Sequence, residues 1–422
     1  MKKKGIIAFF ETLIALCIVL DCESIWKWMD HSAYFRIALV FCYIASLAML
    51  VFLYGKIYRK EHVIAFLALY LSVLLFYNAF VNYSRFMDTV QLVLCLFLMV
   101  LYFKKTQNIA HILERCSRIL YFLACMSLFF WFFGSVLHVF APSQQITIYV
   151  SNVPKVCKSY FFLHYEVQKE EILAGLYRNT GIFYEGPKYV LLLAAFLAYE
   201  LFLTGKPAYK RCVIFTITAL STFTMTGIYA IGLIWLMFFF MQFSAKTTRG
   251  LFLRIAFMIV LFLVGIQAVS YLEDMFSLKS ATASYRTRMD NYLAGFKAWK
   301  EHLLMGAGYL NMDTIMAHYS SFRLNDIGYS NSIFRVLAQG GLYLAIIYII
   351  PVIKALTSGI KERNGKFLAF VLVYLYFFIT TSFPYNYVNH LYLLIMYFGM
   401  HKYSASDVAV KHAVRKKMKG IS

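Results

Sequence analysis

Long apolar runs constrain the fold of this 422-residue chain more than any other feature. We count twelve, covering residues 5–20, 35–54, 63–80, 88–103, 119–140, 187–204, 211–225, 228–243, 253–271, 332–351, 367–383 and 388–401. A bilayer core about 30 Å thick needs roughly 20 apolar residues in a helix. The runs are continuous rather than alternating, so membrane-spanning strands are excluded as the main element. The sequence predicts an all-α polytopic membrane protein of about 12 transmembrane helices, with residues 1–422 in one integral membrane domain.

The seventh and eighth runs share one apolar stretch. Its only break is Thr-Met-Thr-Gly at residues 224–227. Because glycine adopts turn conformations without a steric penalty, we expect Gly227 to supply the turn between two short helices.

Composition supports this class and excludes others. The chain is 61% hydrophobic and 14% charged, whereas a soluble chain averages about 45–50% apolar and about 25% charged residues. This excludes an ordinary soluble enzyme, a disordered protein and a secreted disulfide scaffold. No CxxC motif and no cluster of His and Cys suggests a metal site.

The distribution of charge predicts the orientation in the membrane. The formal net charge is +21. With the N-terminus inside, the inner segments hold 26 Lys and Arg against 4 acids, and the outer segments hold 15 against 14. This pattern satisfies the positive-inside rule, so both termini are predicted to be cytoplasmic. Because topology and anionic lipid explain a basic inner face, nucleic acid is not a predicted partner.

Two long loops direct attention to the outer face, at about 141–186 and 272–331. Loops of this length are usually functional or disordered, and these are rich in Tyr, Phe, Arg and His. The first ends with Arg178, Glu185 and Lys188 at the membrane boundary, where ionisable groups are costly and are candidates for function. Snorkelling and helix capping are the alternative explanation.

The second loop contains an amphipathic stretch. Its apolar positions recur every three to four residues, at Tyr285, Met289, Tyr292, Leu293, Phe296, Trp299 and Leu303. This predicts a helix at the membrane surface. Arg286 with Asp290 and Lys297 with Glu301 are spaced for ordinary i, i+4 pairing. Arg288 has no acid at that spacing and is the stronger candidate for binding a ligand.

The tenth run carries an arginine, Arg335, one helical turn inside its outer end. An arginine at that depth needs an anionic partner. The partner is either an acid such as Asp326 or a phosphate of the substrate, since arginine binds phosphate bidentately.

These residues suit chemistry on a lipid-linked polyanion. ATP is absent from the outer face, so a reaction there needs an activated donor, such as a lipid diphosphate sugar. Its leaving diphosphate could be stabilised by arginines. An acceptor hydroxyl could use one general base, and the outer candidates are Glu185, Asp326 and His318. Each of these alone is more often structural.

Three stretches resemble motifs of Wzy-type polysaccharide polymerases and cover roughly residues 175–350. The first is Arg178-Asn-Thr-Gly181-Ile-Phe183-Tyr-Glu185-Gly-Pro187, which opens a span. The second is Arg286 and Arg288 followed by Trp299 and Leu304-Met-Gly306-Ala-Gly308. The third is Ser330-Asn331-Ser332-Ile333 with Leu337 and Gly340-Gly341-Leu342. They occur in the family's order and with similar spacing.

The resemblance implies a GT-C-like glycosyltransferase of the bacterial cytoplasmic membrane. Such an enzyme moves a growing glycan from undecaprenyl diphosphate onto the next lipid-linked repeat unit of an O-antigen or capsule. It works without a metal or another cofactor. Arg178 and Arg288 would hold the diphosphate, with Arg286 in reserve. Arg335 and Lys188 are further candidate ligands because of their positions at the membrane boundary and not because of the family's motifs. A chain-length regulator and a flippase are the implied protein partners.

Two departures and two alternatives stay open. The Ser-Arg that often follows the family's seventh span is replaced here by Ser221-Thr-Phe-Thr-Met-Thr-Gly227, and the frequent His before Asn331 is Ser330. That histidine matters most in O-antigen ligases, so its absence favours a polymerase and leaves the base unassigned. The other alternative is a flippase or transporter, which should show polar, broken helices at mid-membrane. The span interiors are nearly free of charge.

Overall fold

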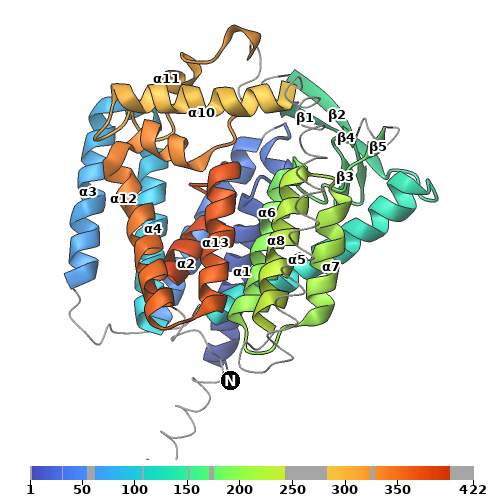
Figure 1. Ribbon diagram of the computed structural model, residues 1–422, viewed down its shortest axis with the longest axis horizontal. Helices are drawn as coiled ribbons and strands as arrows, with labels where there is room; N and C mark the ends of the chain where they lie inside the picture. The colour runs from blue at the N-terminus through green and yellow to red at the C-terminus, as the bar shows by residue number, and fades with distance from the viewer. Residues whose placement is uncertain are drawn as a thin grey trace, which may run out of the picture.

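The computed structural model describes residues 2–30, 32–54, 62–106, 109–150, 153–170, 175–242, 283–323 and 328–399. This part of the chain is mostly helical, and a bundle of helices forms its body (Figure 1). Seven described helical segments are long and apolar enough to cross a membrane. That agrees with the predicted class of helical, multi-pass membrane protein. The ninth apolar run, 253–271, lies outside the described residues, and the total of twelve spans stays a prediction.

The described helices overlap the predicted runs, but the helix at Ala110 starts nine residues before its run, and the helix that ends at Lys361 continues ten residues beyond its run. They are α1 (Lys2–Asp21), α2 (Ser32–Leu53), α3 (His62–Val81), α4 (Phe86–Thr106), α5 (Ala110–Phe130), α6 (Gly186–Ala198), α7 (Tyr209–Ser221), α8 (Met225–Gln242), α10 (Ala283–Glu301), α11 (Asp313–Met316), α12 (Ser332–Lys361), α13 (Gly365–Thr380) and α14 (Tyr387–Phe398). Shorter 3-10 or π segments are η1 (Ile25–Lys27), η2 (Tyr83–Arg85), η3 (Trp131–Val136), η4 (Tyr199–Leu203) and η5 (Ser321–Arg323). We call the end of the bundle where α1 ends and α12 begins the loop end. It is the predicted outer side and lies at the top of Figure 1.

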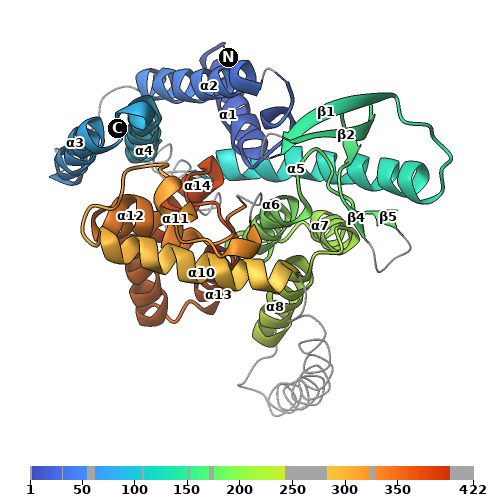
Figure 2. The same ribbon diagram turned by 90° about the horizontal axis from the view of Figure 1, so that it is seen from above.

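The amphipathic helix predicted in the second loop is α10, which lies across the loop end (Figure 1). Seen from above, it runs from α12 towards α8 (Figure 2). Its small residues Ala294 and Ala298 are buried against the protein, whereas Leu293 is 56% exposed. The predicted helix is therefore confirmed, with Met289, Leu293 and Phe296 exposed and with Tyr292 and Trp299 half-buried.

α12 is broken one third of the way along, and the loop after α10 fills the break. Gly341 has φ 60° and ψ −163°, a conformation that interrupts the helix. The carbonyls of Ala338 and Gln339 accept from the N–H groups of Ala307 (2.8 Å) and Gly308 (3.0 Å). The N–H groups of Leu342 and Tyr343 donate to Leu303 (3.0 Å) and Leu304 (2.9 Å). Backbone polar groups at membrane depth must be satisfied inside the protein, and this exchange satisfies all four. The second and third family-like motifs therefore meet here.

The first loop contains strands, which the all-α prediction did not include. They are β1 (Gln144–Val150), β2 (Val153–Tyr160), β3 (His164–Glu166), β4 (Lys169–Glu170) and β5 (Leu176–Tyr177). β1–β2–β3 form an antiparallel sheet and β4–β5 a small hairpin (Figure 1). The alternation of β-branched and polar residues in β1 favours a strand. This signal is short, and the much longer apolar runs dominated the prediction.

A buried polar cluster joins this sheet to the bundle. The Ser135 hydroxyl donates to Glu166 Oε1 (2.9 Å) and lies 3.3 Å from His164 Nε2, and the Tyr160 hydroxyl also donates to Glu166 (2.9 Å). Burial lowers the pKa of His164 from 6.5 to about 3. The folded protein therefore keeps this imidazole neutral under mildly acidic conditions.

We expect acid to lower the stability of this sheet because His164 is buried in its neutral form. As pH falls below 6.5, the unfolded chain takes up a proton that the folded chain refuses, so stability is lost with falling pH. From pH 6.5 to pH 5 the expected loss is roughly 2 kcal/mol. Limited proteolysis of the 141–186 loop across this pH range should show it. The His164→Asn variant should show a weaker pH dependence of proteolysis. The control variant His302→Asn, at an exposed histidine, should keep the pH dependence of the unmodified protein. Equal pH dependence in His164→Asn and the unmodified protein would contradict this assignment.

The turn between α7 and α8 confirms the predicted split but not the predicted role of its glycine. Phe223 adopts the left-handed conformation (φ 51°), and Gly227 lies inside α8. A Cβ at Gly227 would come within 2.9 Å of the Val190 side chain. The interpretation of Gly227 as the turn residue was therefore wrong, because its small size serves the close packing of α8 against α6.

Candidate functional site

The connection between α1 and α2 is fastened to the segment that opens α6. The Ile25 N–H donates to the Ile182 carbonyl (2.9 Å), and the Tyr184 N–H donates to the Glu23 carbonyl (3.0 Å). The Trp28 and Tyr184 rings stack at 4.4 Å. Two segments about 160 residues apart therefore form one rigid unit at the loop end.

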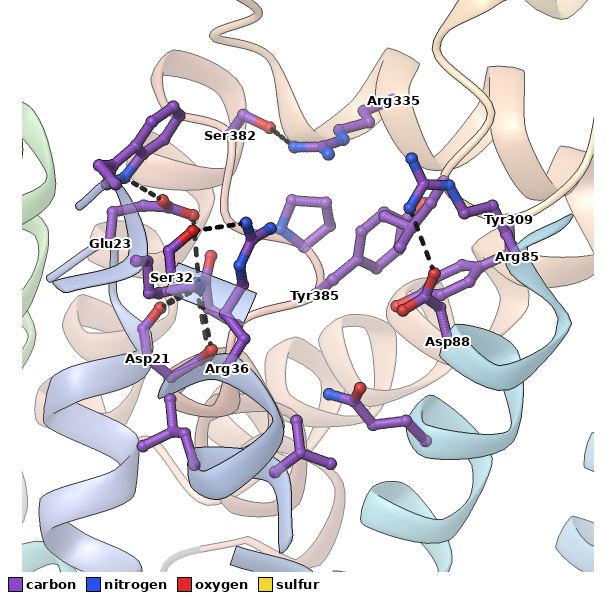
Figure 3. Close-up of a pocket in the computed structure, with 18 of the residues that line it drawn as sticks. Asp21, Glu23, Ser32, Arg36, Arg85, Asp88, Tyr309, Arg335, Ser382 and Tyr385 are labelled. Carbon is purple, nitrogen blue, oxygen red and sulfur yellow. Dashed lines mark hydrogen bonds and ion pairs between the residues drawn. The ribbon is translucent and has the colours of Figure 1, made fainter. Parts of the chain in front are cut away.

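A cavity of about 760 Å³ opens beside this unit (Figure 3). Its walls come from the α1–α2 connection, the first turns of α2, α4 and α12, and the segment before α14. Its charged lining residues are Asp21, Glu23, Lys27, Asp30, Arg36, Arg85, Asp88 and Arg335. In Figure 3, Arg335 and Ser382 lie along one side, with Glu23 and Arg36 facing Arg85 and Asp88 across the space. The balance of cations, carboxylates and tyrosines suits a ligand that is both anionic and rich in hydroxyls.

Arg335 and Lys188 meet at one residue. The Arg335 Nη1 donates to the Ser382 hydroxyl (3.0 Å), and the Lys188 ammonium donates to the Ser382 carbonyl. The Arg335 guanidinium also lies over the Tyr385 ring, 5.4 Å from its centre. Within the described residues no carboxylate lies within 4.0 Å of Arg335. A neutral serine and an aromatic face leave its charge available to the cavity.

Two glutamates near these cations have opposite pKa shifts. Burial alone would raise the pKa of Glu23, but the charges of Lys27, Lys188 and Arg335 outweigh it and the pKa lies below 4.5. For Glu185, burial raises the pKa above 4.5 despite the charges of Lys188 and Arg288. At neutral pH Glu23 is therefore the more firmly ionised of the two.

The aromatic wall of the cavity is held by α3. The Asn78 carboxamide oxygen accepts from the Tyr309 N–H (2.7 Å), and the Asn82 amide donates to the Tyr309 carbonyl (2.9 Å). The Tyr309 and Tyr385 rings meet edge to face at 4.6 Å. The Tyr385 hydroxyl donates to Gln339 beside the break in α12 (2.8 Å). The end of α3 therefore positions Tyr309, and the break in α12 positions Tyr385 against it.

No protein-family model matches the chain, and no curated protein matches it either. In the described part of the chain, no group of three or more His, Cys, Asp or Glu side chains is arranged to hold a metal ion.

Of the predicted phosphate ligands, the structure places Arg335 on the cavity and Lys188 directly behind it. Arg288 is exposed on α10 and lies within electrostatic reach of Glu185. Arg286 stacks on the Phe322 ring at 5.6 Å, and its expected partner Asp290 instead bonds the Ser320 hydroxyl (2.5 Å). These two arginines are not among the residues that line the cavity.

Arg178 directly follows β5, before α6 begins. Its N–H donates to the Gln168 carbonyl next to β4 (2.9 Å), and it does not line the cavity. Arg178, which opens the first family-like motif, therefore lies beside the small hairpin rather than on the cavity.

The predicted bases separate in the same way. Glu185 is the residue before α6 and does not line the cavity. His318 Nε2 lies 2.9 Å from Glu301, which ties it to the exposed end of α10. Asp326 lies outside the described residues. None of the described candidates thus meets the cavity directly.

Sequence reasoning missed Glu23, Lys27, Arg36 and Arg85, all of which line the cavity. Glu23, Lys27 and Arg85 belong to short connections and Arg36 to the first turns of α2, so none of them lies in the two long loops. The pair Asp21 and Glu23 at the end of the first span was the available signal, because acids at the membrane boundary are costly.

Proposed function

We propose that the protein is a polysaccharide repeat-unit polymerase, a GT-C-like membrane glycosyltransferase. It would transfer a growing glycan from its undecaprenyl diphosphate onto the next lipid-linked repeat unit. The observation that carries this proposal is the cavity at the loop end, where Arg335 lies on the lining with no described carboxylate within 4.0 Å of it. A leaving diphosphate gains negative charge as its bond to the sugar breaks, and a fixed guanidinium stabilises that charge.

The other cavity residues fit the sugar part of such a substrate. Tyr309, Tyr385 and Trp28 offer flat faces with polar edges, and the carboxylates can accept hydrogen bonds from hydroxyl groups. Lys188 supports the same anionic region from behind Ser382. Three of the predicted arginines do not line the cavity: Arg178, Arg286 and Arg288. They would attract the anionic lipid-linked substrate towards the cavity rather than stabilise the breaking bond.

The proposal includes the setting of the enzyme. The chain would cross the bacterial cytoplasmic membrane twelve times, with both termini in the cytoplasm and the cavity on the outer side. The positive-inside distribution of Lys and Arg supports this orientation. The lipid bilayer, a flippase that delivers repeat units and a chain-length regulator would be its partners.

Deleting the protein tests the function directly. Cells without it should display glycan of a single repeat unit, because delivery and attachment continue while elongation stops. Gel separation of the surface glycan would show one short band in place of a ladder, and the unmodified gene should restore the ladder.

Other outcomes identify other functions. Lipid-linked units trapped on the inner leaflet would indicate a flippase. Long lipid-linked chains that are never attached to their final acceptor would indicate a ligase. An unchanged ladder would refute all three.

A further inference from the structure

The cavity contains one carboxylate whose backbone, charge and position set it apart. Glu23 lines the cavity and its side chain is 23% exposed, so it is reachable yet largely enclosed. It lies just beyond the end of α1, beside the cations that face the same space. Neither the long-loop pattern nor the family-like motifs assign it a role.

The backbone of Glu23 is held in a conformation that glutamate rarely adopts. Its φ is 58°, in the left-handed region. Its N–H donates to the Asp21 carbonyl (2.7 Å), and its carbonyl accepts from the Tyr184 N–H (3.0 Å). Ser24 pairs with Phe183 in an isolated β-bridge. Such backbone strain persists only where surrounding contacts enforce it, and it concentrates at functional sites.

The carboxylate still has capacity to accept a proton or a hydrogen bond. Trp28 Nε1 donates to Oε2 (3.0 Å), and the Lys27 ammonium lies 3.7 Å from Oε1. An ionised carboxylate offers about four acceptor positions. These two neighbours orient the group and leave positions for a ligand in the cavity.

Of the three other cavity carboxylates, Asp30 is exposed, and Asp21 and Asp88 are paired with other groups. Asp21 Oδ2 accepts from the Tyr387 N–H (2.8 Å) at the start of α14, and its Oδ1 pairs with Lys27 (3.2 Å). Asp88 pairs with Arg85 (3.6 Å) one helical turn away, and its side chain is 39% exposed. Glu23 is thus the enclosed carboxylate with capacity facing the space where Arg335 lies.

We propose that Glu23 is the catalytic base that removes the proton from the acceptor hydroxyl. In this step the hydroxyl oxygen forms a bond to the anomeric carbon of the donor glycan. The bond from that carbon to the diphosphate oxygen breaks, and its electron pair leaves with the diphosphate towards Arg335. The hydroxyl proton passes to the Glu23 carboxylate. This inference rests on the proposed polymerase function and adds the residue that the sequence left unassigned.

A weak carboxylate base is sufficient for this step. The hydroxyl becomes strongly acidic only as its oxygen bonds to the anomeric carbon, so the base must be ionised and in place rather than strongly basic. The cations that keep Glu23 ionised meet that requirement. Burial raises the pKa of Glu185, and this residue does not line the cavity.

Purified protein in lipid vesicles, supplied with the lipid-linked repeat unit, tests the proposal. Glu23→Gln keeps the shape of the side chain and should lower kcat about 100-fold or more while changing KM little. Glu23→Asp should retain part of the rate. Asp88→Asn, the matched change at another carboxylate of the same cavity, should cost far less.

A second variant guards against misfolding. Glu23→Gly relieves the left-handed backbone conformation, so it should fold, and added formate should restore part of its activity by replacing the missing carboxylate. A kcat for Glu23→Gln within threefold of the unmodified protein would overturn the proposal. So would equal losses in Glu23→Gln and Asp88→Asn, or a folded Glu23→Gly that formate does not rescue. These outcomes leave the polymerase function intact if the unmodified protein elongates chains, whereas failure of the unmodified protein refutes that function instead.

Discussion

Arg335→Ala is expected to stop chain elongation while leaving the protein folded. The guanidinium donates one hydrogen bond to Ser382 (3.0 Å) and lies over Tyr385, so its loss removes few structural contacts. Loss of one donor to a developing negative charge typically costs about 100- to 1000-fold in rate. In cells, Arg335→Ala should therefore give single repeat units in place of a glycan ladder. Expression and detergent melting temperature should stay close to those of the unmodified protein.

The controls for Arg335 separate charge from geometry. Arg335→Lys keeps the charge but loses the planar fork, so a partial ladder of shorter chains is expected. Arg118→Ala removes an arginine that is 70% exposed and pairs with Glu114, and it should leave the ladder unchanged. A full ladder from Arg335→Ala, at normal expression, would show that this arginine does not stabilise the reaction.

Gly341→Ala is expected to prevent stable folding. The φ of 60° with ψ of −163° lies in a region that essentially only glycine occupies, at a cost of about 1–3 kcal/mol for other residues. A Cβ there would also collide with the backbone of Leu304, which cannot move without breaking the hydrogen bonds that fill the α12 break. Together these effects should exceed about 3 kcal/mol, and little monodisperse protein should be recovered in detergent.

A glycine that has space for a side chain serves as the control. Gly232 lies in α8 with open space where its Cβ would be, so Gly232→Ala should be neutral or slightly stabilising. Size-exclusion profiles of the two variants provide the comparison. Recovery of Gly341→Ala in the same yield as Gly232→Ala would mean that the break in α12 does not need its glycine.

The helices of the bundle could be predicted because each apolar run repeats one signal over many residues. The same averaging concealed the strands of the first loop, where β1 has only seven residues. It also misassigned Gly227, since a glycine between two runs serves equally for a turn and for close packing. Only the neighbour Val190, contributed by another helix, decides between these roles.

The site was predictable only in part. Arg335 and Lys188 were recognised because a charge near the membrane boundary is costly wherever the chain folds. Glu23 was missed because its importance arises from tertiary contacts, with Tyr184 across the α1–α2 connection and with the charges of Lys188 and Arg335. No residue spacing in the sequence predicts these tertiary contacts. Arg178, predicted from the first family-like motif, does not line the cavity, and its role stays a prediction.

The protein is proposed to elongate a lipid-linked glycan at this cavity. The most direct measurement is the length of the lipid-linked product made by purified protein in vesicles containing only the lipid-linked repeat unit. We predict a series of products that grow by one repeat unit, formed by the unmodified protein and by Arg118→Ala but not by Arg335→Ala. If folded, unmodified protein leaves every repeat unit at its original length, the proposed function is contradicted.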